Sequence, residues 1–101
     1  MCLAFPGVTE RPSHGEAAWF VADKHLFVTM SDHHHDDRFA FWAAAAQGAQ
    51  EMLVANQPDV YFRPPYVGHR GWLGMWLDTP VVDWHDVAVR VREAYGVIAG
   101  A

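Results

Sequence analysis

The stretch Ala17–Met30, AAWFVADKHLFVTM, decides the fold class of this chain. It holds two runs of apolar, β-branched and aromatic residues, Ala17 to Val21 and Leu26 to Met30, with Asp23-Lys24 between them. Two such runs on either side of a short polar turn are typical of a β-hairpin. We therefore expect an antiparallel sheet that begins with this hairpin.

Three segments further along the chain have the same strand-like composition. They are Arg38 to Trp42, Val60 to Arg63 and Gly71 to Leu77. A connection rich in Pro and Gly joins the last two, which is typical of a turn or loop. The sequence thus predicts a second hairpin over 60–77 and a sheet of about five strands.

Two helices are expected beside these strands. Ala43 to Ala55 is rich in good helix formers, with Met52 and Leu53 as its apolar residues. The final helix, Asp83 to Ile98, has Asp83 as an N-cap and apolar residues at a spacing of three and four. Asp86 stands at capping-box spacing from Asp83.

The N-terminal residues predict the end of a helix followed by a loop. Pro6-Gly7 is a helix stop within Cys2 to Val8, and Thr9 to Glu16 is polar. The predicted order is short helix, three strands, helix, two strands, helix. This order favours an α+β fold, with an antiparallel sheet and helices packed on one face.

Composition supports one compact domain over residues 1–101. Apolar residues make up 51% of the 101 residues, and no apolar run approaches the roughly 18 residues that a membrane span needs. Cys2 is the single cysteine, which excludes an internal disulfide and a zinc site built on several cysteines. We expect a soluble, cytoplasmic protein.

The distribution of charge singles out the second hairpin. The net charge is −5, but Val60 to Leu77 carries two Arg and no acidic residue, so the rest of the chain carries −7. Guanidinium groups suit phosphate and aromatic rings suit planar groups. The candidate binding residues of this stretch are Arg63, Tyr66, His69, Arg70 and Trp72. The alternative is a structural role, in which the prolines bound a strand edge and the rings pack inward.

Other reactive residues give weaker patterns. Asp32 to Asp37 holds three histidines and three carboxylates, but successive side chains of an extended segment point in alternate directions, so we expect no metal site. Ser13-His14 beside Glu16 lacks a positioned third group for nucleophilic catalysis. Cys2 lies at a terminus expected to fray. We predict no catalytic residue and no cofactor, and hence no enzyme.

The sequence also resembles the MmcQ/YjbR family along nearly its whole length. The most specific match is Phe62 to Trp72, FRPPYVGHRGW. Weaker landmarks follow the family's order: Leu3 to Glu10, Lys24 to Phe27, Gly48 to Glu51, and Asp83-Trp84 at the start of the last helix.

This resemblance implies a compact α+β fold similar to the frataxin-like (CyaY-like) architecture. It also implies DNA binding through a double-wing motif, with wings at about Ala17 to Met30 and Val60 to Leu77. Members of the family carry further helical turns before the LPGV-like segment, which implies that this chain starts inside its first helix. Frataxin-like iron binding would use an acidic first helix. Because the resemblance implies that most of that helix is missing here, we do not expect this chain to bind iron in that way.

We therefore expect a non-enzymatic DNA-binding protein. Arg63 and Arg70 would contact phosphate, His69 would assist them, and Tyr66 and Trp72 would stack on bases or shape the loop. The acidic net charge predicts weak binding with a steep dependence on salt. The alternatives are a binding module for a planar or anionic small molecule and a subunit that forms a homodimer.

Overall fold

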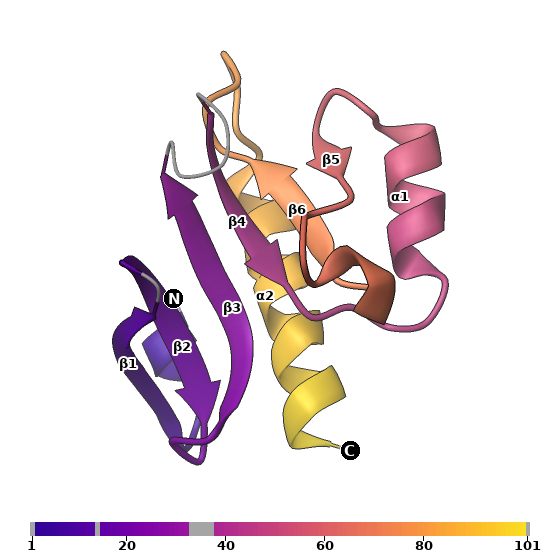
Figure 1. Ribbon diagram of the computed structural model, residues 1–101. Coiled ribbons are helices and arrows are strands. Elements are labelled where there is room, and N and C mark those ends of the chain that lie inside the picture. Colours follow the sequence, from indigo (N-terminus) through magenta and orange to yellow (C-terminus); the bar gives the residue numbers. More distant parts are fainter. Residues whose placement is uncertain (1, 14, 33–37, 101) are drawn as a thin grey trace.

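A computed structural model describes residues 2–13, 15–32 and 38–100 of the chain, with the main chain alone at Asp32. Within these ranges, six strands form one antiparallel sheet, accompanied by two α-helices and two 3-10 turns (Figure 1). The strands are β1 (Val8–Ser13), β2 (Glu16–Val21), β3 (His25–Asp32), β4 (Phe39–Ala43), β5 (Tyr61–Phe62) and β6 (Leu73–Trp76). The helical segments are η1 (Cys2–Ala4), α1 (Ala49–Asn56), η2 (Gly68–Arg70) and α2 (Trp84–Ala99). The predicted α+β class is confirmed.

The sheet places the two predicted hairpins on either side of β4. Its strand order is β1-β2-β3-β4-β6-β5. The 17–30 hairpin is confirmed as β2 and β3, which pair antiparallel with an irregularity between Trp19 and Phe20. The 60–77 hairpin is confirmed as β5 and β6, with Tyr61 opposite Met75.

Among the described residues, strand β1 is the one strand that the sequence did not predict, and it raises the number of strands from about five to six. Thr9 to Glu16 was predicted as a polar loop, but Val8 to Ser13 pairs with β2 along its whole length. Four consecutive residues of β1 are exposed, so it lacks the alternating apolar pattern that marks a strand. It is an edge strand, where Pro12 and charged side chains are tolerated and discourage pairing with other chains.

Helix α2 covers one face of the sheet and completes the core. It runs behind β4 and β6 in Figure 1, and it contacts β2, β3 and β4. Its buried residues, Val87, Val91 and Ala94, follow the predicted spacing. The predicted N-cap is also confirmed, because the Asp83 carboxylate accepts hydrogen bonds from the backbone N–H groups of the second and third helical residues.

Helix α1 is shorter than predicted and lies beside β5, at the edge of the sheet (Figure 1). The sequence predicts a start at Ala43, but that residue ends β4 and the helix begins at Ala49. Leu53 is buried as expected, whereas Met52 is exposed. Alanine suits a helix by propensity, but tertiary pairing with β3 and β6 takes Ala43 into the sheet.

The N-terminal segment is attached to α2. The predicted helix end is a 3-10 turn, η1, and Cys2 is buried there instead of frayed. The Phe5 ring stacks on that of Tyr95 with centroids 4.7 Å apart, and the Tyr95 hydroxyl donates to the carbonyl oxygen of Pro6 at 2.8 Å. Across the ranges that the structure describes, no helix is long and apolar enough to cross a membrane.

Candidate functional site

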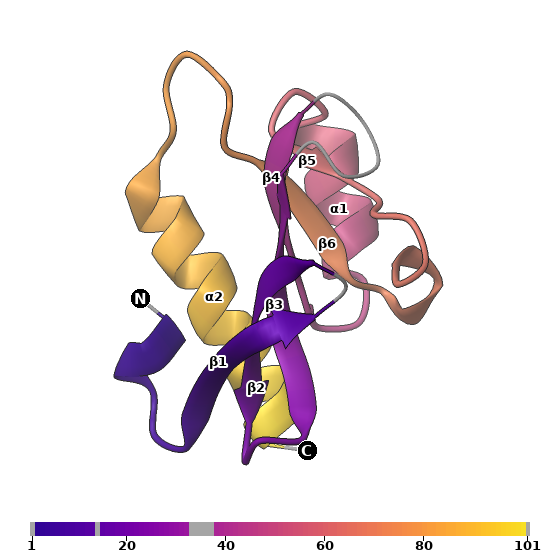
Figure 2. The same ribbon diagram turned by 60° about the vertical axis from the view of Figure 1, so that its left-hand side comes forward.

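The candidate residues all lie on one connection, the 63–72 loop (Arg63 to Trp72), which joins β5 to β6 and contains η2. In Figure 2 the sheet is seen nearly edge on, with α2 on one side and this loop projecting on the other. The loop is therefore not covered by α2.

A buried glutamine on α1 holds this loop in place. The Gln50 side chain is only 5% exposed. Its amide nitrogen donates to the carbonyl oxygen of Gly68 at 2.9 Å and also to that of Trp72. Gly68 is the first residue of η2 and Trp72 follows its last, so one amide holds the turn that presents His69 and Arg70 at both ends.

Arg63 packs across the backbone of Gly68. A Cβ atom at position 68 would lie 2.6 Å from Cγ of Arg63 and 3.0 Å from its Nε. Only glycine leaves room for the arginine side chain in this position. Arg63 as a whole remains exposed.

Arg70 is exposed and lies over an indole ring. Its guanidinium carbon is 5.4 Å from the ring centroid of Trp72, within the range of a cation–π contact. Trp72 itself is 3% exposed and belongs to the core. Trp72 was expected either to stack on bases or to shape the loop. Its burial fits the second role, because it leaves no free ring face for a ligand.

Tyr66 and His69 are both exposed side chains of the loop. Tyr66 is 74% exposed, and its φ of 65° places it in the left-handed region. That conformation is uncommon for a residue other than Gly, Asn or Asp, and for a bulky side chain it carries strain. The loop thus presents a large aromatic ring to solvent in a strained conformation.

No acidic side chain among the described residues neutralises the two arginines of this loop. Ion pairs take up Arg11, Arg38 and Arg90 elsewhere in the molecule. Within the described ranges, neither Arg63 nor Arg70 forms an ion pair. Both guanidinium groups are available to an external anion.

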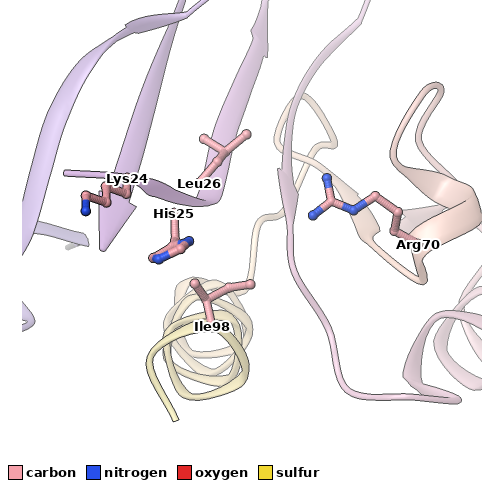
Figure 3. A pocket seen from close by; sticks show the side chains of 5 residues that line it. All are labelled: Lys24, His25, Leu26, Arg70 and Ile98. Carbon is pink, nitrogen blue, oxygen red and sulfur yellow. The ribbon is translucent and has the colours of Figure 1, made fainter. Parts of the chain in front are cut away.

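A hollow of about 520 Å³ is lined by residues from both hairpins (Figure 3). Its lining residues are Lys24, His25, Leu26, Arg70 and Ile98. Three of these come from the turn and start of β3, one from the 63–72 loop and one from the end of α2. The sequence marks Lys24 as part of the hairpin turn and both Lys24 and His25 as family landmarks. Nothing in a linear pattern shows that these two residues approach Arg70.

Metal-binding clusters of three or more His, Cys, Asp or Glu do not occur among the described residues. The histidines 33–35 and His14 lie outside those residues.

Comparison with known proteins identifies a family for this chain. No curated protein and no solved structure matches this chain. The family model YjbR matches residues 3–97 and so includes both hairpins, α1, α2 as far as Val97, and the residues that line the hollow except Ile98. This chain therefore belongs to the YjbR family.

Proposed function

We propose that this protein is a non-enzymatic DNA-binding protein that contacts the phosphate backbone through the 63–72 loop. The single observation that carries the proposal is the pair of exposed guanidinium groups, Arg63 and Arg70, on one loop, neither with an acidic partner among the described residues. Arg binds phosphate oxygens with short, charge-assisted and often bidentate hydrogen bonds. Phosphate contacts of this kind position a protein on DNA without reading its sequence.

The other exposed residues of the loop fit the same partner. His69 offers a ring N–H to a phosphate oxygen, and the exposed ring of Tyr66 offers a stacking surface for an unpaired base. The loop is held by Gln50 before any partner arrives, which reduces the entropy that binding must overcome.

The acidic remainder of the chain limits the strength of this binding. Because the whole protein carries −5, its net charge opposes the approach of DNA to the loop. We expect measurable binding at low salt and much weaker binding at physiological salt.

Fluorescence anisotropy tests this function with labelled duplex and single-stranded DNA at both salt concentrations. The wild type is compared with the Arg63→Ala/Arg70→Ala variant, whose folding is checked by circular dichroism. The proposal predicts that the variant loses binding under conditions where the wild type binds. Equal affinity of the two proteins, or no binding by the wild type at low salt, would exclude this function.

A further inference from the structure

We propose that the hollow between the two hairpins is a binding site for a small organic phosphate monoester. This site differs from the proposed contact of the 63–72 loop with the DNA backbone, because Lys24 and His25 of the other hairpin also line the hollow. Neither residue belongs to the loop that would contact DNA.

The polar groups of the hollow match the chemistry of a phosphate monoester. Arg70 supplies a fork of donors and Lys24 a mobile ammonium group, and neither forms an ion pair within the described residues. His25 supplies a ring N–H in either protonation state. The two positive charges of Arg70 and Lys24 suit a group that carries nearly two negative charges at neutral pH.

Figure 3 shows how these side chains lie. The guanidinium group of Arg70 points from the loop side toward Leu26, while His25 lies on the opposite side above Ile98. Lys24 stands next to His25 at the rim, with its ammonium group directed away from Arg70. We infer that Arg70 is the principal phosphate contact and that Lys24 contributes as a rim charge on a flexible stem.

The remainder of the lining suits the organic part of such a ligand. Leu26 and Ile98 form an apolar wall between the two polar sides. The volume of about 520 Å³ falls within the range of small-molecule sites and exceeds what a bare phosphate ion would fill. A phosphate attached to a small apolar or aromatic body would use both parts of the site.

Phenyl phosphate is a suitable probe, with phenol and inorganic phosphate as the two partial probes. Binding is followed by amide chemical shifts in ¹H–¹⁵N NMR spectra of the full chain. We expect saturable shifts at Lys24, His25, Arg70 and Ile98 with phenyl phosphate, and weaker binding of both partial probes. Shifts that do not saturate, or that lie elsewhere on the molecule, would overturn the proposal, as would equal binding of either partial probe.

Single substitutions test whether phenyl phosphate binds in this hollow or responds only to the total positive charge of the protein. Arg70→Ala is expected to weaken phenyl phosphate binding at least about tenfold, because hydrogen bonds to charged groups are lost, and Lys24→Ala to weaken it less. Arg92→Ala removes the same charge from an exposed position of α2 outside the hollow and is expected to leave Kd unchanged. Equal weakening by Arg70→Ala and Arg92→Ala would overturn the assignment.

Arg63→Ala distinguishes the failure of this proposal from that of DNA binding. Arg63 does not line the hollow, so the variant is expected to keep its affinity for phenyl phosphate while losing affinity for DNA. Loss of phenyl phosphate binding in this variant, with the fold intact, would contradict the separate site. Saturable phenyl phosphate binding by a wild type that does not bind DNA would support this site and contradict the proposed DNA binding.

Discussion

The side-chain amide of Gln50 donates a hydrogen bond of 2.9 Å to the carbonyl oxygen of Gly68 and so joins α1 to the 63–72 loop. The same nitrogen also donates to the carbonyl oxygen of Trp72. Glutamine is seldom fully buried, and here its burial is explained by these two backbone acceptors. Helix α1 therefore contributes to the candidate site by positioning its loop, without presenting a residue to the partner.

Gln50→Ala should destabilise the protein and loosen the loop. Two backbone carbonyls would lose their donor, which costs roughly 1–3 kcal/mol of unfolding free energy in a buried setting. Urea unfolding measures the loss, and hydrogen exchange of residues 68–72 measures the loosening. Gln47→Ala changes an exposed glutamine just before α1 and should shift the unfolding free energy by less than about 0.5 kcal/mol. Equal stability of the two variants would contradict the role given to Gln50.

Gly68→Ala should displace Arg63. The new Cβ atom would lie 2.6 Å from Cγ of Arg63, so the arginine side chain must leave its present position. We expect the variant to lose DNA affinity to a similar extent as Arg63→Ala. Combining the two substitutions should add little further loss, because both act on the same side chain. Additive losses in this double-mutant cycle would show that position 68 acts by another route.

The pair Arg38–Asp78 should make stability depend on pH in the acid range. Two hydrogen bonds of 2.8 Å from Arg38 lower the pKa of Asp78 from 3.8 to about 2. Since the folded state favours the ionised carboxylate, the stabilisation is complete above about pH 4 and is lost as the pH falls through about 2. Asp78→Asn should be less stable than the wild type at pH 7, and the difference should shrink toward pH 2. A difference in urea midpoint that stays constant over this range would refute the coupling.

Cys2 should be unreactive in the native protein. Its side chain is buried, and burial raises the pKa of the thiol to about 11, so little thiolate exists at neutral pH. A thiol reagent such as 5,5′-dithiobis(2-nitrobenzoate) should label the folded protein much more slowly than the protein in urea. Fast labelling without denaturant would mean that η1 is not packed as described.

The fold was largely predictable because its central elements follow strong local patterns. The β2–β3 hairpin has two apolar runs around a polar turn, and α2 has both a cap at Asp83 and a regular apolar spacing. The failures occurred where tertiary structure outweighs local preference. Strand β1 is an exposed edge that gains its hydrogen bonds from β2, and Ala43 has helical propensity but pairs within the sheet.

The candidate site was only partly predictable. Charge segregation pointed to Arg63 and Arg70, and the structure shows both exposed on one loop. The buried position of Trp72 and the support from Gln50 depend on contacts between distant segments, which no spacing reveals. The approach of Lys24 to the same hollow as Arg70 likewise arises from the order of strands in the sheet.

The salt dependence of DNA affinity tests the central claim most directly, because each phosphate contact contributes to its slope. The plot of log K against log salt concentration is measured for the wild type, Arg70→Ala and Arg92→Ala. We predict that Arg70→Ala lowers the slope by about 0.9 and weakens binding, since one phosphate contact is lost. Arg92→Ala, which removes the same charge from α2, should keep the slope of the wild type. Identical slopes for Arg70→Ala and the wild type would contradict phosphate binding by the loop.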